Sequence, residues 1–147
     1  MMASAVARLI ALTEEAVHAL GGTPEVPIRA FPARFGRERR SPKPGARFAE
    51  DLRGGRTPDL NDIYLRELPS TSLHISGEHF AIEYTGDQFF LVDRGSACGT
   101  IVGGQRVGGR RVGGRAPLRD GDEIVVGTSR SRYVFRFDVI EGERNDS

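Results

Sequence analysis

Short apolar segments, each of a length suited to one β-strand, recur along the chain from residue 62 onward. The clearest are DIYLREL, HFAIEY, QFFLVD, EIVVG and RYVFRFDV, which are rich in aromatic and β-branched residues. Turn-forming triplets separate them, such as Thr85-Gly86-Asp87 and Asp120-Gly121-Asp122. Strands of this length at this spacing predict an all-β sandwich of two antiparallel sheets.

The first part of the chain has a different pattern, because apolar side chains recur there at the period of an α-helix. We predict a short amphipathic helix within residues 1–22, with Ser4 as its cap and Gly21-Gly22 as its end. Such a helix either packs on its own domain or offers a surface to a partner or a second copy. The pattern alone favours neither use.

After residue 24 the chain continues in short extended segments, VPIRAF and ARFGR, where Pro27 and Pro32 exclude a long helix. Residues 38–61 then contain few large apolar side chains and several prolines and glycines. Burial within such a segment cannot offset its loss of conformational entropy. We therefore predict that it is a long mobile insertion between two strands.

Charge and cysteine content narrow the classes of function. The 147 residues contain 21 Lys and Arg against 20 Asp and Glu, and this net charge of +1 does not indicate a nucleic-acid binder. The single cysteine excludes an internal disulfide and a multi-cysteine metal site, which is typical of the reducing cytoplasm. We expect one cytoplasmic domain with no metal, no cofactor and no membrane span.

A glycine- and arginine-rich segment, VGGQRVGGRRVGG, lies between the strand signals. It lacks the spacing of a P-loop, and no helical pattern follows it, so that nucleotide-binding motif is excluded. We favour a flexible hairpin region over an Arg-Gly contact with nucleic acid. Salt would separate the two, because binding to a phosphate backbone falls steeply as ionic strength rises.

Five motifs occur in an order that resembles the forkhead-associated (FHA) domain. They are FGRE (residues 35–38), SGEH (76–79), DRGSACGT (93–100), PLRDGDEIVVG (117–127) and a closing YVFRF (133–137). Each motif is weak alone, but the ordered set is specific. The resemblance implies an FHA-type β-sandwich domain over residues 26–140, with the insertion at 38–61, the helix before it and a polar tail at 141–147.

FHA domains bind phosphothreonine peptides through loops at one end of the sandwich. By this resemblance the phosphate-binding residues are Arg37, Ser76 and Gly77, which offer a guanidinium fork, a hydroxyl and a backbone amide. The peptide-contacting loop is Ala97 and Cys98, and the residues that support the site are Gly36, His79, Gly99 and Thr100. The His79 ring is expected to be buried and bonded to loop backbone, so that it holds Ser76 in place.

The Ala97-Cys98 pair departs from the family pattern, which resembles Ser-Thr-Asn-Gly-Thr at these positions. The family asparagine bonds the main chain of the bound peptide, whereas the Cys98 thiol bonds far more weakly. Gly77 also stands where the family often has an asparagine or arginine that contacts the ligand. Two functions therefore stay open: a phosphothreonine-dependent adaptor in serine/threonine kinase signalling, and a phosphate-independent assembly module that uses the N-terminal helix.

Catalysis is not expected from these residues. Ser76 and His79 lack the G-x-S-x-G motif of a nucleophile elbow and an acid at a suitable spacing. Cys98 lies in a predicted binding loop. A place in such a loop accounts for Cys98 more simply than catalysis does, because a catalytic thiol needs a cleft and an activating base. The expected partner is a phosphothreonine-containing protein or peptide, and the helix is a further route to a homo-oligomer. Membranes are not expected as partners, and nucleic acid is disfavoured as one.

Overall fold

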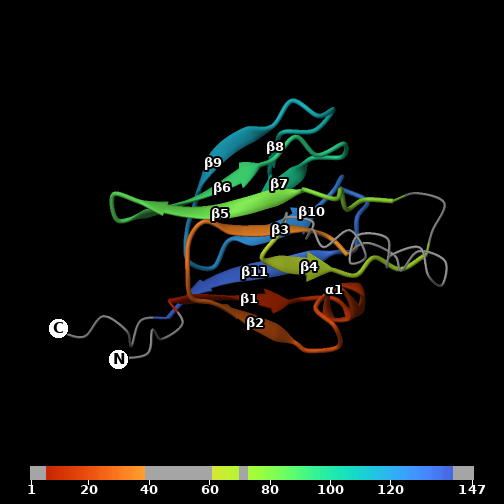
Figure 1. The fold of residues 1–147 in the computed structure, drawn as a ribbon, viewed down its shortest axis with the longest axis horizontal. Helices are drawn as coiled ribbons and strands as arrows, with labels where there is room; N and C mark the ends of the chain where they lie inside the picture. Colours follow the sequence, from red (N-terminus) through yellow and green to blue (C-terminus); the bar gives the residue numbers. More distant parts are fainter. Residues whose placement is uncertain (1–5, 39–60, 70–72, 141–147) are drawn as a thin grey trace, which may run out of the picture.

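Two β-sheets pack into a sandwich in the computed structural model, which describes residues 6–38, 61–69 and 73–140 (Figure 1). The six-stranded sheet runs in the order β2 (Glu25–Ile28), β1 (Ala7–Ala11), β11 (Val134–Val139), β10 (Glu123–Val126), β7 (Thr100–Val102) and β8 (Gln105–Val107). The five-stranded sheet runs in the order β4 (Ile63–Leu65), β3 (Ala33–Arg37), β5 (Phe80–Thr85), β6 (Gln88–Asp93) and β9 (Gly114–Leu118). The predicted all-β sandwich is thereby confirmed.

Neighbouring strands are antiparallel except for β3 and β4, which pair in parallel. Aromatic side chains from both sheets fill the space between them. Phe35 and Phe80 stack with ring centroids 4.5 Å apart, and Phe135 and Phe137 of the opposite sheet are also fully buried. Burial of apolar surface of this kind is the main force that holds a sandwich together.

The predicted helix over residues 1–22 is wrong for its first half, because residues Ala7–Ala11 form β1. This strand pairs with β11 on one side and β2 on the other, so it lies inside the six-stranded sheet. Its apolar residues alternate in burial as a strand requires, and long-range pairing has overridden the local helical period. The proposed cap Ser4 lies outside the described residues.

A helix does follow, but it is the six-residue α1 (Glu14–Ala19), and its N-cap is Thr13. The Thr13 hydroxyl accepts a hydrogen bond from the Ala16 N–H at 3.0 Å. The helix ends before Gly21, as the sequence predicts. Ala16 and Ala19 are fully buried in the core, so this helix packs on its own domain.

The glycine- and arginine-rich segment forms more strand than the sequence suggested. It includes β8 and the start of β9, and β8 pairs with β7 in a hairpin. The hairpin turn is Gly103-Gly104, whose φ angles of 56° and 87° suit a tight turn between antiparallel strands. The predicted insertion does fall between two strands, β3 and β4, but residues 39–60 and the tail at 141–147 lie outside the described residues.

Candidate functional site

Arg37 and Ser76, which are far apart in the sequence, meet at one end of the sandwich. Arg37 is the last residue of β3, and its backbone N–H donates to the Ser76 carbonyl oxygen at 2.9 Å. Its guanidinium donates to the Ile75 carbonyl oxygen, also at 2.9 Å. Because a guanidinium carries five N–H donors, this bond leaves donors for an anion.

The Ser76 side chain joins this pair to a third segment of the chain. Its Oγ accepts a hydrogen bond from the Ala97 N–H at 3.0 Å. Since that bond uses an oxygen lone pair, the hydroxyl hydrogen can still be donated to a ligand. Gly77 follows at an exposed position. The structure therefore brings the end of β3, the Ser76-Gly77 turn and the loop that contains Ala97 and Cys98 together.

His79 lies beneath this junction and is fully buried. Its Nδ1 accepts from the Ser76 N–H at 2.9 Å, and its Nε2 lies 2.8 Å from the Gly99 carbonyl oxygen. Nδ1 is thus an acceptor, so the neutral ring carries its proton on Nε2 and donates it to Gly99. Burial holds the pKa of His79 below its ordinary value, although the Gly99 bond and the Asp93 charge oppose this.

Asp93, at the end of β6, anchors the loop that follows it. The carboxylate accepts from the backbone N–H groups of Gly95 and Ser96 at 3.0 and 2.9 Å. It also accepts from the hydroxyls of Ser96 and Thr100 at 2.7 and 2.9 Å. All four donors reach one carboxylate that is 3% exposed. Four bonds to a buried charge fix the path of the loop between β6 and β7.

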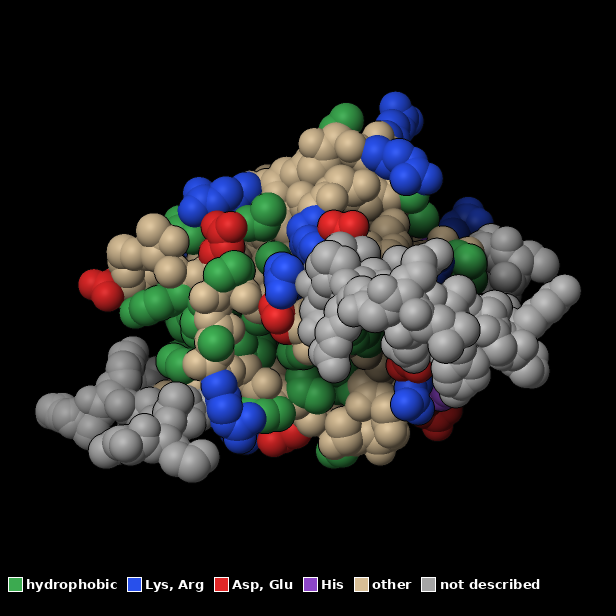
Figure 2. All heavy atoms as spheres, viewed as in Figure 1, with side chains coloured by type: hydrophobic (Ala, Val, Ile, Leu, Met, Phe, Trp, Pro, Cys, Tyr) green, Lys and Arg blue, Asp and Glu red, His purple; other side chains and the backbone are tan. Residues whose placement is uncertain are grey.

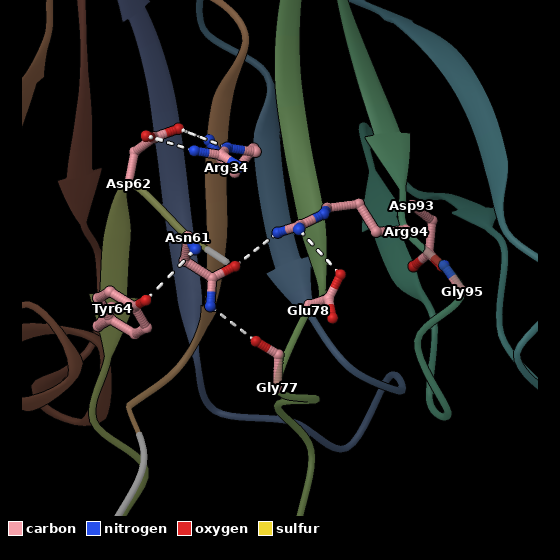
Figure 3. A network of polar contacts seen from close by, with 9 residues as sticks. All are labelled: Arg34, Asn61, Asp62, Tyr64, Gly77, Glu78, Asp93, Arg94 and Gly95. Carbon is pink, nitrogen blue, oxygen red and sulfur yellow. Dashed lines mark hydrogen bonds and ion pairs between the residues drawn. The ribbon is translucent and has the colours of Figure 1, made fainter. Parts of the chain in front are cut away.

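Asn61 fixes the carbonyl side of the Ser76-Gly77 turn (Figure 3). This side chain is 3% exposed, and its amide nitrogen donates to the Gly77 carbonyl oxygen at 2.8 Å. Gly36 of β3 packs against the same two groups: a Cβ there would come within 2.6 Å of the Asn61 amide and would overlap the Gly77 carbonyl. Only a glycine allows this close approach of β3 to the turn.

Two ion pairs surround Asn61 (Figure 3). The Arg94 guanidinium donates to the side-chain amide oxygen Oδ1 of Asn61 and to the Glu78 carboxylate, the latter at 3.1 Å. The Asp62 carboxylate is held by Arg34, with both guanidinium bonds at 3.0 Å, and these bonds keep the pKa of Asp62 below its ordinary value. The network therefore links β3 and the segment before β4 to the Ser76-Gly77 turn and to the start of the loop between β6 and β7.

Ala97 is exposed and Cys98 is half-buried, so the predicted peptide loop does border the solvent. The Cys98 thiol contacts the Leu73 carbonyl oxygen at 3.5 Å, a weak bond. Gly99 is in the left-handed region with φ of 87°, and its carbonyl also accepts from the Gly127 N–H. Both ring nitrogens of His79 are bonded to backbone, so His79 is not a base for this thiol.

Sequence reasoning missed three of the groups that build the site. Asp93 and Ser96 lie within the DRGSACGT motif but were not predicted as site residues, although an aspartate in a turn often accepts a bond from the backbone two residues on, here the Gly95 N–H. Asn61 was assigned to the predicted insertion, and no signal in the sequence links it to Gly77. The described residues contain no group of three His, Cys, Asp or Glu placed to hold a metal ion, and no helix among them could cross a membrane.

The sequence model of the FHA domain matches residues 52–127, which is more than half of the chain. The chain belongs to the FHA domain family. The matched range includes Ser76, His79 and the loop anchored by Asp93, while Arg37 lies before it. A search of curated protein sequences finds no match.

Solved FHA domains have the same fold at low sequence identity. The FHA domain of an Arabidopsis thaliana hypothetical protein is 19% identical, with a TM-score of 0.58 over 99% of this chain and 94% of its own. The N-terminal FHA domain of S. cerevisiae Rad53p, solved with a phosphothreonine peptide, is 18% identical, with a TM-score of 0.57 over 94% of this chain and 96% of its own. Mycobacterium tuberculosis EmbR, solved with a low-affinity phosphopeptide, is 22% identical, with a TM-score of 0.55 over 97% of this chain but 26% of its own.

Proposed function

We propose that this FHA domain binds phosphothreonine peptides and holds the phosphate with Arg37, Ser76 and the Gly77 backbone amide. The observation that carries the proposal is the junction of β3 with the Ser76 turn, where the Arg37 N–H donates to the Ser76 carbonyl oxygen at 2.9 Å. A guanidinium, a hydroxyl and an amide at one point supply three kinds of donor and no acid. Such donors suit the acceptor oxygens of a phosphate dianion.

The support of the site strengthens the proposal. The buried residues His79, Asp93 and Asn61 hold the two loops from below through hydrogen bonds, so the donors do not have to be ordered when a ligand arrives. A site ordered in advance loses less entropy on binding. Rad53p and EmbR were both solved with phosphopeptides, which is consistent with this use of the fold. In the cell the domain would be an adaptor for targets of a serine/threonine kinase.

The alternative, a phosphate-independent assembly module, has less support. It relied on a free N-terminal helix, yet the apolar residues Ala16 and Ala19 of α1 are fully buried in the domain. The altered Ala97-Cys98 loop still favours the assembly module. The Cys98 thiol stands where the family has an asparagine that bonds the peptide main chain, and a thiol bonds far more weakly than an amide. Calorimetry with phosphorylated and unphosphorylated forms of the same peptide separates the two functions.

The test begins with a phosphothreonine peptide library, followed by titration of its hits by calorimetry at moderate salt. Loss of a charge-assisted bond costs about 1.5 to 3 kcal/mol, so Arg37→Ala should weaken binding at least about tenfold. Ser76→Ala should cost less. Arg29→Ala is the matched control, because Arg29 is exposed and follows β2 at the opposite end of the sandwich.

Each hit is also tested as the unphosphorylated peptide and with phosphoserine, which lacks the methyl group of phosphothreonine. We expect the phosphothreonine form to bind best and the unphosphorylated form not to bind. If a broad library gives no hit, or if Arg37→Ala binds the hits as well as wild type does, the proposal is wrong. The assembly module would then be the better account.

A further inference from the structure

The glycine- and arginine-rich segment is attached to the candidate peptide loop. The backbone N–H of Arg110 donates to the Ala97 carbonyl oxygen and that of Arg111 donates to the Ser96 carbonyl oxygen, both at 2.9 Å. The guanidinium of Arg106, on β8, contacts the Cys98 carbonyl oxygen at 3.4 Å. These three arginines are called the arginine rim below. Arg110 and Arg111 are fixed by their backbone, and Arg106 by its guanidinium, to the same loop whose Ala97 N–H bonds Ser76.

The rim has a specific backbone conformation. Arg110 and Arg111 have φ angles of 54° and 63°, in the left-handed region that arginine rarely adopts and that here occurs at two successive residues. The preceding Gly108 packs on the Asp93 carboxylate so closely that a Cβ there would lie 2.5 Å from the carboxyl carbon. The loop is thus built onto the same buried anchor as the candidate site.

The rim is also a concentration of unpaired positive charge. No acidic residue occurs from position 94 to position 119, and all three rim side chains are exposed. Within the described part of the chain, none of the three forms an ion pair. Figure 2 shows arginine side chains projecting from the surface over the β8–β9 end of the molecule. Exposed and unpaired guanidinium groups attract anions, and they fit carboxylate and phosphate with two parallel bonds.

The rim lies close to the proposed phosphate site. Ala97 bonds both the Ser76 hydroxyl and the backbone of Arg110, so one residue separates the proposed phosphate site from the rim. An extended peptide advances about 3.3 Å per residue, and an arginine side chain spans about two such steps. Residues within a few positions of the phosphothreonine therefore come within reach of the rim.

On these grounds we infer that the arginine rim selects phosphothreonine peptides that carry a further anionic group, a carboxylate or a second phosphate, close to the phosphothreonine. This inference rests on the proposed phosphothreonine binding. It gives the rim a function in specificity, whereas Arg37 and Ser76 act on the phosphate that every ligand shares. An anion-selective rim also supplies binding that the thiol of Cys98 cannot.

The test compares three peptides with the same phosphothreonine, flanked on either side by Gln, by Glu or by phosphoserine. They are titrated into wild type and into a double variant, Arg110→Asn with Arg111→Asn. Asparagine is chosen because it tolerates positive φ better than most residues and removes the charge. The control double variant is Arg29→Asn with Arg119→Asn, which removes two exposed arginines outside the rim.

Wild type should prefer the Glu peptide to the Gln peptide by about threefold to tenfold, as expected for one or two exposed ion pairs. The phosphoserine peptide should be preferred at least as strongly, and added salt should reduce both preferences. The rim variant should bind the Gln peptide as wild type does and lose the preference. The control variant should keep it. Arg106→Gln should lose part of the preference for the Glu peptide. Because Arg106 lies on strand β8 and not at a positive-φ position, this variant replaces the double variant if the latter does not fold.

Three results would overturn the inference. The first is that wild type shows no preference among the peptides, and the second is that the rim variant keeps the preference in full. The third is that a single-stranded RNA oligonucleotide binds wild type and not the rim variant while the peptides are not distinguished, which would assign the rim to nucleic acid. A failure of the proposed function gives a different result: no peptide binds in a phosphate-dependent way, and Arg37→Ala does not change peptide binding. The inference rests on that function and is then wrong as well.

Discussion

The two ends of strands β5 and β6 are held by different physical means. At the end near Asp93, buried polar groups hold the loops, and His79, Asp93 and Asn61 are each at most 3% exposed. At the other end, aromatic rings pack at the surface: Tyr84 and Phe89 have centroids 4.6 Å apart, and Tyr84 is 45% exposed. One pair of strands thus carries a hydrogen-bonded end and an aromatic end.

The difference concerns precision. Apolar packing depends on area and has little directional preference, so a hairpin held by rings can shift by small amounts without losing most of its stabilisation. Hydrogen bonds to a buried carboxylate or imidazole fix distance and angle, and leaving such a group without its partner is costly. A site that must present donors at fixed positions is better built on the second kind of end. Substitutions at the two ends should therefore differ in their effect on ligand binding.

The largest effect is expected for Asp93→Ala, compared with Tyr84→Ala at the aromatic end. Removing the Asp93 carboxylate leaves four donors without their acceptor, and we expect a loss of about 3 to 5 kcal/mol in the free energy of unfolding. Tyr84→Ala should cost about 1 to 2 kcal/mol. Chemical denaturation measures both.

Phosphopeptide titration of the same variants sharpens the comparison. The Asp93 variant should lose binding at temperatures where it is still folded, because the loop between β6 and β7 has lost its anchor. The Tyr84 variant should bind as wild type does. Equal losses of stability and unchanged binding in both variants would show that the two ends do not differ as described.

Next in size is Gly36→Ala, with Gly77→Ala as its matched control. A Cβ on Gly36 would overlap the Gly77 carbonyl and displace the Ser76-Gly77 turn, at a cost of about 1 to 3 kcal/mol in stability. Gly77 has open space around it and keeps its backbone amide as alanine, so its replacement should stay within about 0.5 kcal/mol. Phosphopeptide affinity should fall for the first variant only; a fall for Gly77→Ala alone would reverse the assignment.

The fold was predictable wherever local pattern and tertiary pairing agree. The alternation of apolar and polar residues, together with the turn residues, located β5, β6 and β10 closely. A strand with one buried face has such an alternation, because successive side chains point to opposite faces of the sheet. The strand β1 was missed since its five residues fit both periods, and only pairing with β11 decides between them. The Gly103-Gly104 pair is a hairpin signal. The strands β8 and β9 that follow it were not predicted, because this segment has many glycines and few β-branched residues.

The site divides in the same way. Arg37, Ser76 and His79 were predicted as site residues from their motifs, and the structure brings all three together. Asn61 could not be found, because its link to Gly77 depends on how the chain returns after β3. The attachment of Arg110 to Ala97 was equally hidden, since backbone bonds between two loops leave no side-chain pattern. Motifs give the donors, and tertiary contacts give their support.

A smaller effect is expected from pH, through His79. Burial lowers the pKa of this ring in the folded state, so below its ordinary value of 6.5 the unfolded chain binds a proton that the folded protein excludes. Stability should be full above pH 6.5 and should fall as the pH decreases below it, by at most about 1.4 kcal/mol per pH unit, until the folded ring also titrates.

Denaturation at pH 7.5, 6.0 and 5.5, values chosen around the ordinary histidine pKa of about 6.5, measures this slope in wild type and in His79→Gln. The variant should be less stable at neutral pH but should lose the slope, whereas His18→Gln, at an exposed position, should keep it. The carboxyls of Asp62 and Asp138, whose pKa values are lowered from 3.8, act only at more acidic pH and do not enter this window. A slope that survives in His79→Gln would assign it to another group.

The smallest effect is expected at Cys98, on the solvent side of the hydrogen-bonded end. Among the described residues the thiol forms one hydrogen bond, a weak one to the Leu73 carbonyl oxygen at 3.5 Å, so its polar contribution to the loop is small. Cys98→Asn would offer an amide to the main chain of a bound peptide, worth about 1 kcal/mol or roughly fivefold in affinity. Cys98→Ser, which adds no such reach, is the control. Titrating one phosphothreonine peptide into all three proteins measures the gain, and equal or weaker binding by the asparagine variant would show that Cys98 does not border the peptide.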